Sequence, residues 1–241
     1  MDEPDRSTLD LVIAGEAMRL FADRALYWPA RRRLLVADLH LGKGDILRGA
    51  GIPVPSGGTG HDVARLGALL RASGASQLWV LGDFLHGARQ PRVEAAWRAF
   101  LAAHPGCTAS VIAGNHDRAL VPDAAGVVHL PDDVRDGPFR FRHMPVDAHG
   151  EAEGGAGATA DVGADNDADH VICGHLHPVV RLPGLPGRYP ALALDRHQSI
   201  LPAFSAFTGG WLLEHDRSWI ACARGELVGH MDAGWRGAMD C

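Results

Sequence analysis

Residues that can bind metal ions follow several apolar runs of the 241-residue chain. The candidate ligands are Asp38, His40, Asp83, Asn115, His143, His175 and His177. Oxygen and imidazole donors in one set suit ions such as Mn, Fe or Zn, and do not suit a structural zinc held by thiolates. One ion takes about four to six ligands with water included, so the set is large enough for two ions. A carboxylate shared by two ions would hold them about 3.5–4 Å apart, an arrangement that assists in-line displacement at phosphorus.

One histidine stands beside this set without being needed as a ligand. His116 follows Asn115 and precedes Asp117. A neighbouring carboxylate can orient an imidazole and favour its protonated form. A protonated imidazole near the leaving oxygen would act as a general acid. We therefore predict that His116 and Asp117 are catalytic residues.

Three further side chains near the same motifs could contact a substrate phosphate. Lys43 follows the first motif, His86 follows Asp83, and Arg118 follows the third motif. Ammonium and guanidinium groups bind phosphate oxygens through charge-assisted hydrogen bonds. We predict that Lys43, His86 and Arg118 bind substrate, while His86 could instead contact the ligands from behind.

Alternating strands and helices are expected to position these residues. Apolar runs at residues 34–37, 78–81 and 109–113 predict strands, and helical spacing predicts helices at 61–71 and from Pro91 onward. The order strand, helix, strand, helix, strand predicts right-handed crossovers and a parallel sheet covered on both faces. The carboxyl ends of parallel strands lie along one edge, so the polar residues that follow them should converge.

The second half of the chain favours strands. Residues 139–143 alternate in polarity, 170–173 form an apolar run, and 191–194 with 199–204 predict a hairpin. Residues 147–169 are rich in Gly, Ala and Asp and contain no aromatic side chain. We interpret them as a flexible, solvated insertion within a single domain that spans residues 1–241.

Composition excludes several classes of protein. Hydrophobic residues make up 46% and charged residues 22% of the chain, as in an ordinary globular protein. The formal net charge of −6 argues against a broad basic surface for nucleic acid but leaves a local basic groove open. The chain has no bilayer-length apolar stretch, an acidic beginning unlike a signal peptide, and scattered cysteines expected to be free thiols. We therefore expect a cytoplasmic protein with no membrane partner.

The motifs resemble those of the calcineurin-like metallophosphoesterases in order and content. They are Asp38-Leu39-His40, Gly82-Asp83, Gly114-Asn115-His116-Asp117, His143 and Gly174-His175-Leu176-His177. The resemblance implies an α/β fold: a four-layer α/β/β/α sandwich with two mixed sheets flanked by helices and a dinuclear metal centre. It implies that one ion is held by Asp38, His40, Asp83 and His177. It implies that the second is held by Asp83, Asn115, His143 and His175, with His116 as the acid.

Longer segments resemble one bacterial subfamily, the ligase-associated DNA damage response endonucleases, also called PdeM. Residues 38–43, 50–55 and 201–210 carry this resemblance. It implies a hydrolase of phosphoester bonds, most specifically a manganese-dependent phosphodiesterase or nuclease that acts on DNA during repair. It also implies association with DNA ligase and helicase repair factors.

Two other functions use the same fold. The same metal site serves phosphoesterases for small nucleotides or phosphoproteins, so the motifs do not distinguish those substrates from DNA. A non-catalytic scaffold would be expected to have lost ligands or the acid. His116 and every expected ligand are present here, which disfavours the scaffold.

Overall fold

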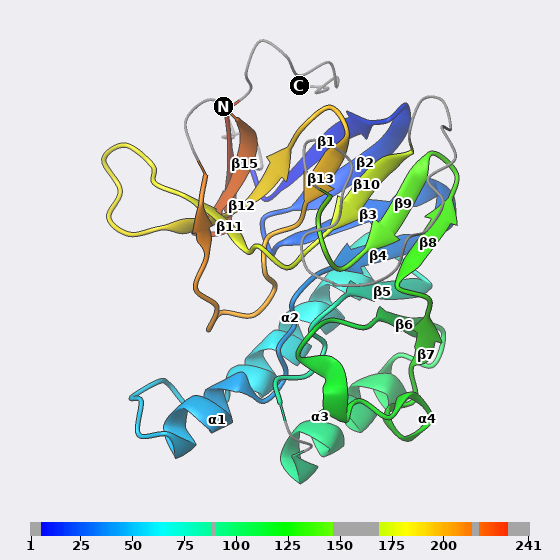
Figure 1. Ribbon diagram of the computed structural model, residues 1–241, viewed down its shortest axis with the longest axis vertical. Helices are drawn as coiled ribbons and strands as arrows, with labels where there is room; N and C mark the ends of the chain where they lie inside the picture. Colours follow the sequence, from blue (N-terminus) through cyan, green and yellow to red (C-terminus); the bar gives the residue numbers. More distant parts are fainter. Residues whose placement is uncertain (1–5, 88–89, 147–168, 214–216, 231–241) are drawn as a thin grey trace, which may run out of the picture.

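The first of two sheets is antiparallel on one side and parallel on the other (Figure 1). The computed structural model describes residues 6–87, 90–146, 169–213 and 217–230. Across this sheet the strands are β1 (Thr8–Ile13), β2 (Glu16–Phe21), β3 (Ala25–Trp28), β4 (Arg33–Val36), β5 (Gln77–Leu81), β6 (Thr108–Ile112) and β7 (Val128–Leu130). Strands β1 to β4 pair antiparallel, whereas β4 to β7 pair parallel. The predicted strands at 34–37, 78–81 and 109–113 and their parallel order are confirmed.

The second sheet is also mixed. Its main path runs β14 (Trp211–Leu212), β11 (Pro178–Val180), β12 (Tyr189–Leu194), β13 (Gln198–Ile200), β10 (His170–Cys173), β9 (Phe139–Arg142) and β8 (Asp133–Asp136). Strand β15 (Ser218–Ala223) pairs with β12, and β16 (Glu226–His230) pairs with β15. The predicted hairpin is confirmed as β12 and β13, which pair antiparallel. Its second strand ends at Ile200 and not at residue 204, because the chain leaves this sheet there.

Helices pack on the outer face of the first sheet (Figure 1). They are α1 (Lys43–Gly49), α2 (Gly58–Ser73), α3 (Pro91–Ala103) and α4 (Pro122–Ala125). Leu66 of α2 and Trp97 of α3 belong to the same buried cluster as Val80 of β5. Helix α2 stops at Gly74, whose left-handed backbone lets its N–H donate to the Leu70 carbonyl. None of the described helices is long and apolar enough to span a lipid bilayer.

The main core lies between the two sheets. Successive residues of a strand face opposite sides, so Leu35 and Leu81 of the first sheet pack with Ile172 and Leu192 of the second. The outer face of the second sheet is covered by loop residues such as Leu182, and no helix covers it within the described part of the chain. The predicted α/β sandwich of two mixed sheets with flanking helices is confirmed.

The predicted insertion lies almost wholly outside the described residues. Of residues 147–169, only Asp169 is described. Its Oδ2 atom lies 3.1 Å from Nε of Arg135 on β8. The insertion therefore stays a prediction.

A buried histidine in β10 makes the stability of the fold sensitive to acid. Burial lowers the pKa of His170 from 6.5 to about 4, and its Nε2 lies 2.9 Å from Ser199 Oγ. The folded-state pKa is the lower one, so stability is full above pH 6.5 and is lost as the pH falls toward 4. The loss should be roughly 3 kcal/mol. His170→Gln should remove this part of the acid dependence, as measured by urea unfolding at several pH values.

The matched control for this prediction is His129→Gln, because His129 is an exposed histidine on β7. That variant should lose stability in acid as the wild type does. An equal acid loss in His170→Gln and wild type would contradict the assignment.

Candidate metal centre

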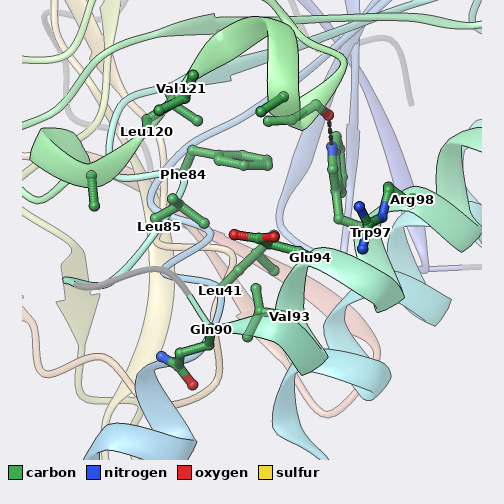
Figure 2. Close-up of a pocket in the computed structure, with 13 residues that line it drawn as sticks. Leu41, Phe84, Leu85, Gln90, Val93, Glu94, Trp97, Arg98, Leu120 and Val121 are labelled. Atoms are coloured by element: carbon green, nitrogen blue, oxygen red, sulfur yellow. Dashed lines mark hydrogen bonds between the residues drawn. The ribbon is translucent and has the colours of Figure 1, made fainter.

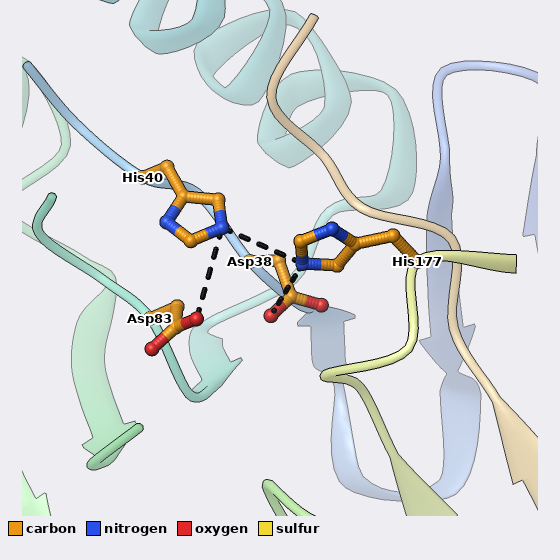
Figure 3. Close-up of side chains that lie close together, drawn as sticks. All are labelled: Asp38, His40, Asp83 and His177. Carbon is orange, nitrogen blue, oxygen red and sulfur yellow. Dashed lines mark hydrogen bonds and ion pairs between the residues drawn. The ribbon is translucent and has the colours of Figure 1, made fainter. Parts of the chain in front are cut away.

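Loops at the carboxyl ends of several strands bring four of the candidate ligands close together (Figure 3). We call these four residues the first group. Asp38 and His40 follow β4, Asp83 follows β5, and His177 follows β10. One ligand atom from each residue lies within 4.8 Å of the others. Both aspartates and His40 are buried, and His177 is half-buried. The sequence placed these residues together, and the structure does so too.

Distances in this first group fit a cation between the side chains. His177 Nε2 lies 3.3 Å from Asp38 Oδ1 and 3.4 Å from His40 Nε2. His40 Nε2 lies 3.7 Å from Asp83 Oδ2. Asp38 Oδ1 is buried and has no hydrogen-bond donor. A buried carboxylate oxygen without a donor is costly, and a bound cation would satisfy it.

A second group of ligand atoms lies against the first. His143 Nε2 is 3.1 Å from Asn115 Oδ1 and 3.1 Å from His175 Nδ1. His143 Nδ1 lies 3.2 Å from the Leu81 carbonyl, to which its N–H can donate. That bond would leave the Nε2 lone pair facing the other two atoms, as in a histidine that binds a metal.

Asp83 joins the two groups. Its Oδ2 faces His40, while its Oδ1 lies 3.7 Å from His143 Nε2. The backbone N–H of His116 donates to the same Oδ1 at 2.9 Å. Each oxygen of one carboxylate therefore faces a different ligand group, an arrangement that would allow Asp83 to bridge two ions.

Several candidate ligands have a left-handed backbone. Positive φ angles occur at Asp38 (55°), His40 (45°), Asp83 (47°), His175 (72°) and His177 (50°). Such conformations cost non-glycine residues on the order of 1–3 kcal/mol each and persist only where the surrounding structure fixes them. Backbone bonds from Asp38 N–H to the Gly82 carbonyl and from His40 N–H to the Asp83 carbonyl, 3.2 and 2.7 Å long, hold this turn.

Two glycines in the motifs permit the close approach of the loops. A Cβ atom on Gly82 would collide with the His143 ring. A Cβ atom on Gly174 would lie 2.8 Å from Asp38 Oδ2 and 2.6 Å from the Cβ of Ala37. Any side chain at either position would push a candidate ligand away, which explains why glycine precedes Asp83 and His175.

His116 lies beside the first group and stacks on His86. The two rings are 4.8 Å apart with an interplanar angle of 28°. His86 Nδ1 lies 3.2 Å from His40 Nδ1, so His86 reaches the rear nitrogen of a candidate ligand. Burial lowers the pKa of His40 to about 2 and also lowers the pKa of His86. Both shifts favour the neutral imidazole, which is the form that binds a metal ion or accepts a hydrogen bond.

Asp117 holds two loops together. Its carboxylate accepts hydrogen bonds from the backbone N–H groups of Gly114, Phe84 and Leu85, at 2.8, 3.1 and 2.7 Å. Burial raises the pKa of Asp117, while these amides lower it. The bonds fix the spacing between the loop of Asp83 and the loop of His116, a role that the sequence did not predict.

The two predicted basic contacts lie at the same end of the sheet. Lys43 begins α1 and is half-buried, and burial lowers its pKa while Asp83 and Asp38 act to raise it. Arg118 lies in a short 3₁₀ helix (Asp117–Ala119) and is exposed. Arg118 is therefore open to solvent, and Lys43 is close enough to Asp83 and Asp38 for their charges to act on it.

An apolar pocket lies behind the ligand loops, between α3 and α4 (Figure 2). It has an empty volume of about 490 Å³ and is lined by Phe84, Leu85, Trp97 and Leu120, among others. None of the candidate ligands is among the described residues that line it. The chemistry suggested by the polar residues therefore lies outside this pocket.

Comparison with solved structures identifies a similar nuclease. The crystal structure of Pseudomonas putida nuclease MPE is similar to this chain at 32% sequence identity and a TM-score of 0.74. The match covers 92% of this chain and 100% of that chain. The Aquifex aeolicus protein of unknown function AQ665 matches at 16% identity over 60% of this chain and 78% of that chain, with a TM-score of 0.39. No protein-family model and no curated protein matches the chain.

Proposed function

The chain belongs to the family of the Pseudomonas putida nuclease MPE, and on that basis we propose that it is a metal-dependent phosphodiesterase that cleaves DNA. The observation that carries the proposal is the meeting of two ligand groups at Asp83. A dinuclear site of this kind suits phosphoryl transfer to water. The calcineurin-like motifs of the sequence support the same reaction.

The proposed centre holds two divalent cations, with manganese as the expected metal. One ion is assigned to Asp38, His40, Asp83 and His177. The other is assigned to Asp83, Asn115, His143 and His175. Mixed carboxylate, amide and imidazole donors fit Mn and also Fe or Zn. Ions bound there would supply positive charge toward phosphoryl oxygens and would make water a better nucleophile.

The chain's own residues orient the substrate and move a proton. Lys43 and Arg118 bind the non-bridging phosphate oxygens from the open side. His116 donates a proton to the leaving oxygen. Its backbone bond to Asp83 and its stacking on His86 keep the imidazole at a fixed place beside the ligands. Asp117 acts through the backbone, by fixing the spacing of the two loops.

We also propose a cytoplasmic role in DNA repair, with DNA ligase and helicase factors as partners. This part depends on the resemblance of residues 38–43, 50–55 and 201–210 to the ligase-associated endonucleases. Co-purification of the tagged full-length chain with a ligase or helicase would support it. The extract is treated with nuclease so that DNA cannot link the proteins. If neither a ligase nor a helicase then co-purifies with the chain, the result would count against this role.

The test of the enzyme proposal is hydrolysis of bis(p-nitrophenyl) phosphate by metal-stripped protein titrated with Mn²⁺. Turnover should appear only with metal and saturate at about two ions per chain. Two bound ions without turnover of this diester or of an oligonucleotide would instead favour the scaffold. Turnover confined to small nucleotides would favour the alternative substrate class.

A further inference from the structure

A second, polar pocket opens beside His177 on the side of the second sheet. Its empty volume is about 580 Å³. One wall is formed by β11 and β12, and the other by part of the segment of residues 203–210. That segment belongs to one of the sequence motifs, residues 201–210, yet the proposed reaction gives it no role. Two arginines, Arg24 and Arg188, line the same pocket.

The wall formed by residues 203–210 is fixed to the candidate metal centre at both ends. The Phe204 N–H donates to the Ala37 carbonyl at 2.8 Å, and the Ser205 N–H donates to the Asp38 carbonyl at 3.3 Å. At the other end, the Trp211 N–H donates to the His177 carbonyl at 3.1 Å. The pocket therefore has a set position relative to two candidate ligands.

Arg24 is held in place by the same segment. Its Nη1 donates to the carbonyls of Ala203, Phe204 and Ser205 at 3.4, 3.4 and 3.1 Å. Asp23 and Asp62, whose charges also act on Arg24, are paired with Arg65. The guanidinium is thus anchored by neutral carbonyl groups. Burial lowers the pKa of Arg24, but an arginine stays protonated at neutral pH.

The charge of the pocket differs from that of the whole chain. The formal net charge of the chain is −6. Among the described residues that line the pocket there is no carboxylate, while Arg24 and Arg188 are both present. Such a site favours an anion, and guanidinium groups bind phosphate oxygens in particular. His177 belongs both to this pocket and to the candidate metal centre.

We propose that this pocket binds a phosphate of the nucleic-acid strand adjacent to the phosphodiester that is cleaved, through Arg24 and Arg188. The inference rests on the proposed function and adds to it a binding site for the polyanionic backbone. A substrate with several phosphates would occupy both sites, because they share His177. A substrate with a single phosphate would occupy the metal centre alone.

Arg188→Ala tests the proposal, because Arg188 is exposed and its replacement should leave the core intact. Binding of a short labelled oligothymidylate is measured by fluorescence anisotropy in EDTA, at several salt concentrations. We expect about a tenfold loss of affinity. The plot of log association constant against log salt concentration has a negative slope, which should become less steep by about 0.7. Arg188→Lys should restore most of the slope because it keeps the charge. Hydrolysis of bis(p-nitrophenyl) phosphate should be unchanged, because that diester has a single phosphate.

The control is Arg181→Ala. Arg181 directly follows β11, is exposed and does not line the pocket. It should leave affinity and salt slope unchanged. Equal effects of both variants would overturn the proposal, as would no effect of Arg188→Ala or no salt-dependent binding by the wild type. The binding assay contains neither metal nor turnover, so it is separate from the test of the enzyme. An inactive wild type with an Arg188-dependent slope would overturn the proposed function alone.

Discussion

Replacing Asp83 with asparagine should lower the turnover of bis(p-nitrophenyl) phosphate by about 10³-fold or more. The two oxygens of Asp83 face different ligand groups, with Oδ2 toward His40 and Oδ1 toward His143. Asparagine keeps one oxygen and nearly the same shape, but it removes the negative charge and one donor atom. Metal content should fall from about two ions per chain to one or none.

The measurement for this variant pairs turnover with metal analysis of the purified protein. Asp133→Asn is the matched control, because Asp133 is an ion-paired carboxylate that contacts Arg140 on the hairpin of β8 and β9. That control should keep both metals and its turnover. Two tightly bound ions and nearly normal turnover in Asp83→Asn would show that Asp83 does not bridge.

Replacing His116 with alanine should lower the turnover of an oligonucleotide by about 10²–10⁴-fold while both metals stay bound. The leaving group of DNA is an alkoxide that needs a proton, whereas p-nitrophenolate leaves without one. The loss should therefore be much smaller with bis(p-nitrophenyl) phosphate. A general acid predicts this difference between substrates, and a merely structural histidine does not.

His129→Ala provides the control, because His129 is an exposed histidine on β7. It should behave as the wild type with both substrates. If His116→Ala lost activity equally on both substrates, His116 would have to act on the ligands and not on the leaving group. Unchanged turnover of the oligonucleotide would remove His116 from the reaction.

The sequence predicted the ligand cluster because it depends on a general rule of topology. Apolar runs ending in Asp38, Asp83 and Asn115 indicated parallel strands, whose carboxyl ends share one edge. The structure places these side chains there, with His143 and His177 from the second sheet. Lys43 and Arg118 were predicted to lie near the site because each follows one of the motifs closely in the sequence.

Contacts between distant segments could not be predicted in this way. The apolar run of residues 199–204 reads as one strand, but Phe204 leaves the second sheet and bonds to Ala37 at the end of β4. The sequence suggested Asp117 as the partner of His116 because the two are adjacent. The hydrogen bond that its carboxylate accepts from the Leu85 N–H depends on the distance between two loops, which no local pattern specifies.

Short helices were missed for a related reason. Helix α1 spans Lys43–Gly49 and contains two glycines, so neither its length nor its composition marks it. It is held by tertiary packing, since the Phe207 ring lies 3.2 Å from where a Cβ of Gly44 would be. The segment of residues 203–210 therefore packs against this helix and also forms one wall of the polar pocket.

The left-handed backbone at the candidate ligands also limits how this family can diverge. Asp38, His40, Asp83, His175 and His177 share this conformation, which glycine, asparagine and aspartate adopt at the lowest cost. A valine or isoleucine at one of these positions would both remove a ligand and destabilise the turn. A homologue that has lost catalysis but kept its fold should therefore carry glycine or asparagine at these positions. A related sequence with glycine or asparagine at these positions would therefore be expected to act as a binding scaffold and not as an enzyme.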